Sequence, residues 1–492
     1  MKSIFKAPNL LYRLSYIYIA LPICIFLLGW LKPYISIPLT LIVTIALFLC
    51  LKKTPLPDWQ ITWNQKTIET FIFAAIIIAF WVYLSGIGGL AFQTSDHTCR
   101  NTIFELLVTE KWPVAISGRE LIYYIGFWMP AAVVGKLFGI TIGYYFQAIW
   151  AFLGLFIFFY LLCHHFKEVK LWYLIVFIMF SGLDILGCAI LKFDPSSFMY
   201  FTEGESIYAI GSVTHLEWWS GFQFSSFTTQ LFWVFNQALP SWIIILLISQ
   251  QKSNRNIIFL LGCTLLSSTF PFIGMLPFIV YWMVSRKYGD TFKGWIKNFI
   301  KDTFTFENVL GGGIAGIISF LYLRGNQSSQ LQSSNVSSHN TKTFLMVCII
   351  FILIEVGLYY IAIYKYNKRN PLYYISFIWL CLCPLTAVGS GQDFCMRASI
   401  PALVLLFIMV ADTLRSTYSD KCWKIFIPLL VLLCIGSVTP LHEINRSIRY
   451  TVQDYYTQSS PMAENVSVDD IMYGANFSGD CTNDFFYQYF CK

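Results

Sequence analysis

The chain has 492 residues, of which 57% are hydrophobic, 18% aromatic and only 12% charged, and its formal net charge is +7. Soluble globular proteins carry about 25% charged residues, so this composition excludes a soluble protein and indicates an integral membrane protein. The sequence contains no phosphate-binding Gly-Lys-Ser/Thr loop, no HExxH zinc motif and no paired CxxC, and no nucleic-acid partner is expected.

A membrane-crossing helix needs about 20 mainly apolar residues, because backbone groups cannot be left unpaired in lipid. The apolar runs predict an all-α, polytopic integral membrane protein with about thirteen crossings. Several runs are short, and the pair interrupted by Pro271 and Pro277 is open to interpretation as one broken hairpin. The predicted crossings are 14–31, 34–51, 68–92, 141–163, 171–191, 232–250, 256–270, 272–285, 308–323, 343–364, 372–389, 399–414 and 423–440.

Basic residues concentrate in every second loop, as expected for loops that stay in the cytoplasm. We expect the protein to lie in the cytoplasmic (plasma) membrane with its N-terminus on the inner side. This orientation agrees with the basic loops only if 121–139 does not cross the membrane. We therefore interpret 121–139 as a re-entrant or interfacial pair of helices on the outer face, which leaves the C-terminus outside. The inner segment 286–307 is expected to be an amphipathic surface helix, with Trp295 and Ile296 against lipid.

This topology divides the chain into a transmembrane part, 1–440, and a small extracytoplasmic tail, 441–492. The transmembrane part carries two large outer loops, 93–140 and 192–231. Cys481 and Cys491 both lie in the tail, where a disulfide and two free thiols are equally compatible with the sequence.

The first outer loop begins with a cluster of ionisable residues. Asp96, His97 and Arg100 follow the third predicted crossing, and apolar residues then recur at helical spacing as far as Trp112. Asp96 is expected near the start of this helix, where a carboxylate caps free backbone amides. Helix capping and catalysis are both sufficient explanations of Asp96.

Three acidic residues, Asp184, Glu355 and Asp412, fall inside predicted crossings. A carboxylate in the membrane is costly and indicates function by default. Glu355 lies nearest the middle of its crossing, which suits a proton path or a polar partner on a neighbouring helix. Asp412 is close enough to the inner surface to meet Arg415.

Two regions resemble the GT-C superfamily of membrane glycosyltransferases. In the first, Asp96 opens the outer loop shortly after a crossing, and the loop continues through Tyr123-Tyr124 to Lys136-Leu137-Phe138-Gly139. The usual family pattern has a His four residues after this Asp, whereas Arg100 stands there in this chain and His97 adjoins Asp96. The second resemblance is carried by the run from Gly389 to Ala402, by Glu217-Trp218-Trp219, and by the tail from Asn476-Phe477 to Tyr489-Phe490.

The resemblance implies inverting transfer of a sugar from a polyprenyl-phosphate donor to a glycan, lipid or protein acceptor on the outer face, as in bacterial cell-surface polysaccharide synthesis. Asp96 is then the general base that activates an acceptor hydroxyl. A guanidinium is well shaped to neutralise the leaving phosphate, and the candidates are Arg397, Arg100 and Arg119. The remaining candidates are His97, Glu120, Glu217, Gln392 and Asp393.

The partners that this chemistry implies are membrane lipid and the polyprenyl-linked sugar, and the sequence establishes no cofactor. A divalent cation is an alternative means of neutralising the phosphate, for which the loop offers Asp96 and His97 as adjacent ligands.

Structural explanations compete with these roles. Arg397 and Asp393 are spaced i to i+4 and suit an ion pair in a turn. Arg119 and Glu120 suit a solvated interfacial pair, and Glu217 with the two following tryptophans suits the rim of an aromatic belt.

Two other functions remain open from the sequence. A transporter or flippase of an amphiphilic substrate is favoured if Asp184, Glu355 and Asp412 converge near the middle of the membrane. A catalytically silent membrane protein is favoured if no outer cavity exists. A shared outer site for Asp96 and Arg397 favours the transferase.

Overall fold

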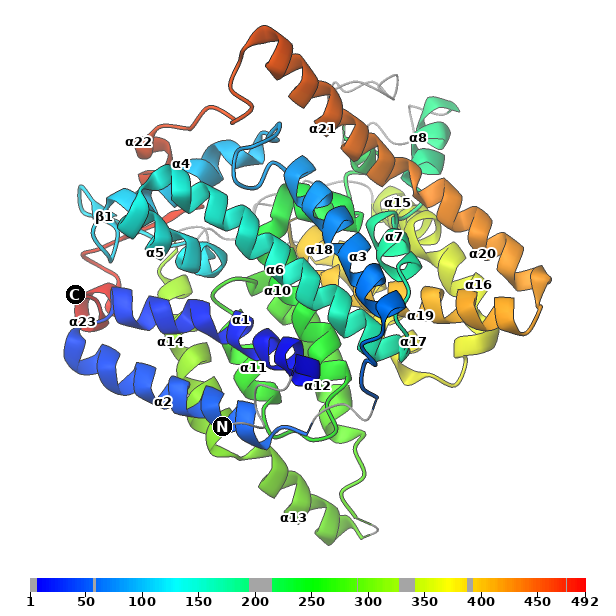
Figure 1. Cartoon of the computed structure of the whole chain (residues 1–492), viewed down its shortest axis with the longest axis horizontal. Coiled ribbons are helices and arrows are strands. Elements are labelled where there is room, and N and C mark those ends of the chain that lie inside the picture. The colour runs from blue at the N-terminus through cyan, green and yellow to red at the C-terminus, as the bar shows by residue number, and fades with distance from the viewer. Residues whose placement is uncertain are drawn as a thin grey trace.

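The computed structural model describes residues 7–55, 59–193, 215–289, 291–326, 341–386, 393–474 and 476–492. These residues form a bundle of helices with one small three-stranded sheet at its edge (Figure 1). The all-α class is confirmed.

The first half of the chain supplies helices up to the second outer loop. They are α1 (Ala7–Trp30), α2 (Pro33–Lys53), α3 (Gln65–Leu84), α4 (Asp96–Thr109), η1 (Ile125–Trp128), α5 (Met129–Phe138), α6 (Ile140–Phe166), α7 (Trp172–Ile178) and α8 (Asp184–Phe193). The strands are β1 (Ala115–Ile116), β2 (Arg119–Leu121) and, near the C-terminus, β3 (Ser478–Asp480).

The second half supplies the remaining helices, several of them short or irregular. They are η2 (Leu216–Trp218), α10 (Phe227–Ser249), α11 (Ile257–Thr264), α12 (Thr269–Val284), α13 (Phe292–Thr303), η3 (Glu307–Gly312), α14 (Gly313–Arg324), α15 (Thr341–Ile352), η5 (Leu353–Gly357), α16 (Leu358–Asn367), α17 (Pro371–Leu382), η6 (Cys383–Leu385), α18 (Asp393–Ala398), α19 (Ile400–Ser419), α20 (Trp423–Gly436), α21 (Val438–Thr457), α22 (Val468–Met472) and α23 (Phe485–Phe490).

Eight helices in the described residues are long and apolar enough to cross a membrane, or up to nine if a pair bent by 57° counts as one span. Thirteen crossings are therefore not confirmed. The predicted run 171–191 is divided into α7 and α8, and the predicted run 256–270 holds only the eight-residue α11. The eight spans are Leu10–Trp30, Pro33–Lys53, Gln65–Leu84, Ile140–Phe166, Phe227–Ser249, Phe344–Asn367, Ile400–Ser419 and Trp423–Thr457.

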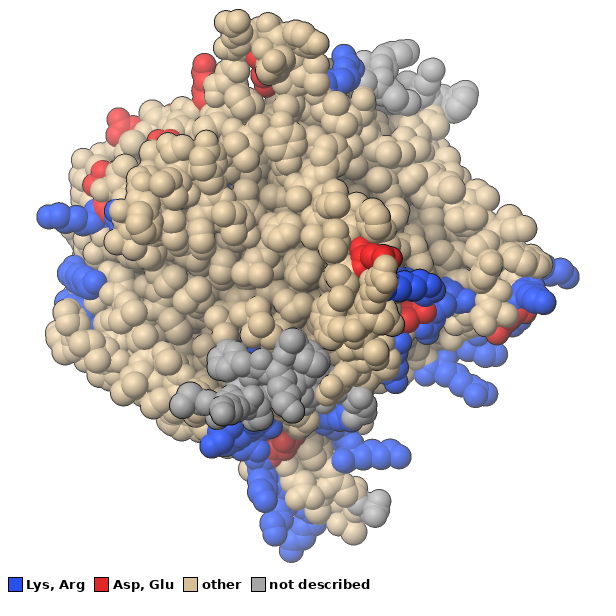
Figure 2. Space-filling view, viewed as in Figure 1, with Lys and Arg blue, Asp and Glu red and all other residues tan. Residues whose placement is uncertain are grey.

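The outer surface of the bundle is apolar, as a protein solvated by lipid requires. On α2, Ile37, Leu41 and Phe48 are exposed along one stripe, whereas Val43 and Ala46 face the interior. In Figure 2 the Lys and Arg side chains gather along the lower and lower-right edges, and an uncharged band covers most of the surface above them. This separation of charge agrees with a membrane protein.

The segment 286–307, predicted to lie on the inner side, contains the expected amphipathic helix as α13. Ile296 is exposed, as expected for a lipid-facing residue. Trp295 instead turns toward the protein, where its Nε1 donates to the Arg286 carbonyl and its ring stacks on Phe299.

The segment 121–139 contains η1 and the ten-residue α5, which is shorter than a crossing needs. Gly139, at φ 98°, separates α5 from α6. The two helices approach closely because glycines face each other: a Cβ on Gly143 would lie 2.9 Å from the Gly135 Cα. Lys136 then reaches across to the Val108 carbonyl near the end of α4, at 3.0 Å.

The C-terminal tail folds against the first outer loop. β3 pairs with β2 in antiparallel register, with Arg119 opposite Asp480 and Leu121 opposite Ser478. In the tail, α22 also contacts α4. The backbone of Cys491 forms an isolated antiparallel β-bridge with Leu31, just after the end of α1. The loop 93–140 and the tail therefore lie at the same end of the molecule. Cys481 and Cys491 are both free thiols in this structure.

These contacts predict the sidedness of three exposed positions. Lys111 and Thr482 belong to the loop and the tail, whereas Asn298 lies on α13 at the opposite end (Figure 1). In a background without accessible native cysteines, Lys111→Cys and Thr482→Cys should react with a membrane-impermeant maleimide from the same side of sealed vesicles. Asn298→Cys should react only after the vesicles are opened or inverted; labelling of all three from one side would contradict the arrangement.

Candidate functional site

Two ion pairs from distant parts of the sequence meet beside the first outer loop. In α4, Arg100 Nη2 donates to Asp96 Oδ2 at 2.7 Å, and in α18, Arg397 Nη1 lies 3.0 Å from Asp393 Oδ2. The Asp96 carboxylate is 42% exposed, whereas the Arg100 side chain is only 5% exposed. The carboxylates thus form an accessible rim and the guanidinium groups lie beneath it.

Tyr123 joins the two pairs. Its hydroxyl is buried within electrostatic reach of Arg100, Arg397, Asp96 and Asp393. Burial opposes the charge on Arg397, but Asp393, the two tyrosines and Asp96 together raise the pKa of Arg397 above its usual value. We call Asp96, Arg100, Tyr123, Tyr124, Asp393 and Arg397 the two-arginine site.

Both arginines lie on aromatic rings inside the protein. The Arg100 guanidinium is 5.6 Å from the Phe235 ring centroid, and that of Arg397 is 6.0 Å from the Phe270 ring centroid. Such contacts compensate part of the cost of burying a cation without using its N–H donors. They hold each arginine in place and leave donors free for another acceptor.

Unused hydrogen-bonding capacity gathers at this site. Among the described residues, Nε and Nη1 of Arg100, Nε of Arg397 and Nε2 of His97 are buried without a hydrogen-bond partner. Buried polar groups in native proteins are almost always satisfied, so a concentration of exceptions indicates water or a ligand.

His97 lies behind the ion pair. Its Nδ1 is 3.1 Å from Thr94 Oγ1, and its ring stacks on Phe235 at 5.7 Å. Burial, aided by the charge of Arg100, lowers the pKa of His97 to about 3, so the imidazole is neutral at physiological pH. Asp96 is close to the start of α4, as predicted, but its carboxylate bonds Arg100 and no side-chain cap is made by Ser95.

The loop that carries Asp96 is held by the tail. Gln93 Oε1 accepts from Asn101 Nδ2 at 2.8 Å and from the Ala463 amide at 2.9 Å. Thr102 Oγ1 donates to the Val466 carbonyl at 2.9 Å. The segment following α21 therefore fixes the orientation of α4.

Arg119 and Glu120 lie away from the two-arginine site. Arg119 donates to the Met472 carbonyl and to Ser478 Oγ, both in the tail. Glu120, next along the strand, is buried beside Asp484 and Asp480; burial first, and then these two acids, raise the pKa of Glu120 to about 8. Both residues belong to the contact between the loop and the tail.

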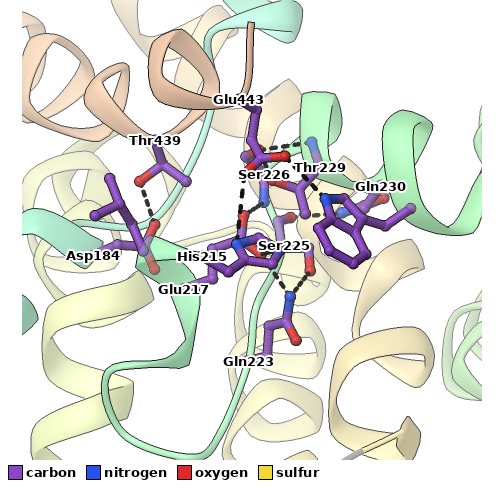
Figure 3. Close-up of polar contacts among 12 residues, drawn as sticks. Asp184, His215, Glu217, Gln223, Ser225, Ser226, Thr229, Gln230, Thr439 and Glu443 are labelled. Carbon is purple, nitrogen blue, oxygen red and sulfur yellow. Dashed lines mark hydrogen bonds and ion pairs between the residues drawn. The ribbon is translucent and has the colours of Figure 1, made fainter. Parts of the chain in front are cut away.

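Glu217 belongs to a second polar group, shown in Figure 3, that lies deeper in the protein. Its Oε1 accepts from the Ser226 amide at 2.8 Å and its Oε2 from Gln223 Nε2 at 2.7 Å. Burial first, and then the charge of Asp184, raise the pKa of Glu217 to about 8. Glu217 is thus a buried acid rather than part of an exposed aromatic rim.

His215 connects Glu217 with α21. Its Nε2 is 3.9 Å from Glu217 Oε2, and its Nδ1 is 3.7 Å from Glu443 Oε1 (Figure 3). Burial lowers the pKa of His215 to about 4, so it is neutral at physiological pH. Asp96 acts electrostatically on His215, which places the second group beside the two-arginine site. We call Asp184, His215, Glu217, Glu355 and Glu443 the acid network.

Glu443 is compensated by Arg446 one helical turn later, at 2.5 Å, and accepts from Trp233 Nε1 at 2.9 Å. A non-helical residue, Val234, kinks α10 between Trp233 and Phe235. Trp233 therefore contacts the acid network, and Phe235 contacts Arg100 and His97.

The residues missed by the sequence analysis are Tyr123, Tyr124, His215, Glu443 and Arg446 as members of a shared site. His215 sits in an outer loop, with no motif to single it out. For Glu443 and Arg446 the sequence did contain a signal. Their opposite charges, three residues apart, suit one face of a helix that continues beyond the predicted end at 440. Gln392 lies outside the described residues.

No group of three or more His, Cys, Asp or Glu side chains that could hold a metal ion occurs among the described residues. The Asp96 side chain is partly exposed and bonds Arg100, whereas His97 is buried and contacts Thr94. Comparison with protein-family models, with curated proteins and with solved structures finds no match for this chain.

The pKa of Glu217 makes stability depend on pH. A carboxyl whose folded pKa of about 8 exceeds the unfolded value of 4.5 favours folding fully below pH 4.5 and loses this contribution as the pH rises through 8. His97 and His215 act in the opposite sense, but mainly below their ordinary pKa of 6.5. Between pH 6.5 and 8.5 the free energy of unfolding in detergent should fall, with roughly 2 kcal/mol of the fall due to Glu217.

Glu217→Gln should make this part of the profile less steep because an amide does not titrate, and the slope that remains includes the contribution of Glu120. Glu464→Gln, at an exposed position, is the control and should follow the wild type. Equal slopes for all three proteins would show that Glu217 does not titrate in this range.

Proposed function

We propose that this protein is a membrane glycosyltransferase of the GT-C kind, with the two-arginine site as the place where the phosphate of a polyprenyl-linked sugar binds. The observation that carries the proposal is the concentration of buried, unbonded guanidinium donors beside an accessible carboxylate. A phosphate group accepts several charge-assisted hydrogen bonds, which is what Arg100 and Arg397 can still donate. Arg119 is left out of the phosphate site because its guanidinium bonds the tail.

The site suits a ligand that stays in the membrane. The spans beside it are apolar on their outer surfaces, and a polyprenyl phosphate is too amphiphilic to leave the bilayer. We infer an orientation in the cytoplasmic membrane with the N-terminus and the basic loops inside and the C-terminus outside, so that the site opens to the outer leaflet.

In the reaction, the acceptor hydroxyl loses its proton to the Asp96 carboxylate as its oxygen attacks the anomeric carbon of the sugar. The bond from that carbon to the phosphate oxygen breaks, and the polyprenyl phosphate leaves with the additional negative charge. Arg100 and Arg397 stabilise that charge where it develops. Asp393 positions Arg397, as Asp96 positions Arg100 before the acceptor arrives.

A transporter of an amphiphilic substrate is the second candidate, and one observation favours it. Asp184 and Glu355 converge inside the protein, where both are buried and interact electrostatically. Asp412 does not join them, because it pairs with Arg415 at 2.6 Å near the end of α6. Convergence of Asp96 with Arg397 makes the transferase the better supported of the two.

The transferase proposal predicts that Asp96→Asn reduces transfer by at least about 100-fold, since removal of a general base typically costs a factor of 10² to 10⁴. The full-length variant should be expressed in its host at the wild-type level, followed by analysis of surface glycans and of lipid-linked sugars. The glycan product should decrease and its lipid-linked donor accumulate.

The matched control is Asp412→Asn, which removes a carboxylate from another Asp–Arg pair on the same protein. It should leave the glycans unchanged. Normal glycans from a well-expressed Asp96→Asn protein would contradict the role of Asp96.

A further inference from the structure

A short non-helical break separates α7 from α8, and Asp184 is the first residue of α8. Residues 179–183 are not helical, and two hydroxyls bond the Asp184 carboxyl next to this break. Ser181 Oγ donates to Asp184 Oδ2 at 3.0 Å, and Thr439 Oγ1 of α21 donates to the same oxygen at 2.7 Å (Figure 3). Asp184 is only 1% exposed.

Glu355 enters this break from another helix. It lies in the middle of the π-helical turn η5, inside the span Phe344–Asn367, and is 1% exposed. Its Oε1 accepts from Trp219 Nε1 at 2.9 Å. Its Oε2 lies so close to Gly182 that a Cβ there would be 1.6 Å from it. A glycine in the break is therefore what admits this carboxyl.

The two carboxyl groups interact electrostatically with each other, and Glu355 Oε2 is buried with no hydrogen-bond partner among the described residues. Ionised carboxylates only accept hydrogen bonds, so Glu355 Oε2 can bond the Asp184 carboxyl only if one of the two groups carries a proton. Neither group has an ion pair among the described residues, so no cation compensates a second negative charge. Two uncompensated carboxylates in contact inside a membrane protein would be far too costly.

We propose that Asp184 and Glu355 form a buried proton-binding site, in which one shared proton joins the break between α7 and α8 to the π-helical turn of η5. Both irregular elements support a functional role: π-helical turns occur frequently at functional sites, and broken helices in membranes are tolerated where they surround a binding site. This site is distinct from the two-arginine site and stands independently of the transferase proposal.

Titratable neighbours of the pair lie on four of the surrounding elements. Glu217 of η2, Cys188 of α8, Tyr359 of α16 and Cys395 of α18 all interact electrostatically with Asp184 or Glu355. None of these four groups is a cation, so they do not replace the proton.

The acid network provides a route for the proton from the outer end. His215 lies 3.9 Å from Glu217 and within electrostatic reach of Asp96, which is accessible. Glu217 in turn acts on both Asp184 and Glu355. Release of the shared proton would leave two facing carboxylates, whose repulsion separates the break from η5.

Infrared spectroscopy of the full-length protein in liposomes at neutral pH tests the site without requiring activity. The wild-type minus Glu355→Gln difference spectrum should contain the C=O band of a protonated carboxyl, shifted in D₂O, and the wild-type minus Asp184→Asn spectrum should contain it too. In each variant the new amide donates to the remaining carboxylate, so the fold is retained and the shared proton is lost.

Asp412→Asn is the matched control, since its carboxyl is paired with Arg415 and should give no such band. Absence of the band from both difference spectra would overturn the proposal. So would a marked loss of wild-type thermal stability when Na⁺ is replaced by choline, because the pair would then hold a metal cation.

Discussion

Charged groups can be buried in an apolar helical bundle only if a partner compensates each of them, and this constraint organises the outer end of the molecule. Arg100 is compensated by Asp96 on the same helix, Arg397 by Asp393 and Glu443 by Arg446. Each pair is local in sequence, at i to i+3 or i to i+4. Tertiary structure then brings the pairs together, because α4 and α21 contact the kinked α10 and α18 packs on α12 beside it.

The ion pairs alone do not satisfy all the hydrogen-bond donors of Arg100 and Arg397. A guanidinium has five N–H donors, and its single carboxylate partner leaves buried donors on both Arg100 and Arg397. Aromatic rings support these cations without using the donors. A phosphate would accept hydrogen bonds from the remaining donors of both arginines. The geometry therefore favours the binding of an anionic, membrane-bound ligand over a purely structural role for the two arginines. The Asp184–Glu355 pair is compensated differently, by a proton in place of a cation.

Composition and hydrophobic runs were sufficient to predict the all-α membrane fold, the start of the loop helix at Asp96, and the Arg397–Asp393 pair, because these depend on local sequence. The span count and the shape of the site depend on contacts between distant segments. A break at 179–183 divides one predicted crossing, and the last crossing continues to Thr457. Arg119 and Glu120 are neighbours of the loop cluster in sequence, but strand pairing with β3 directs them to the tail. His215 and Glu443 are distant from Asp96 in sequence but lie near it in the fold, and no local pattern predicted this.

Arg100 and Arg397 together form the proposed binding site of a lipid phosphate. Native mass spectrometry of the purified full-length protein with a polyprenyl phosphate measures this binding directly. The wild type and the control Arg415→Gln should retain the lipid, whereas Arg100→Gln and Arg397→Gln should each weaken its binding by at least about tenfold, the equivalent of about 1.4 kcal/mol. Equal retention of the lipid by all four folded proteins would contradict this binding site.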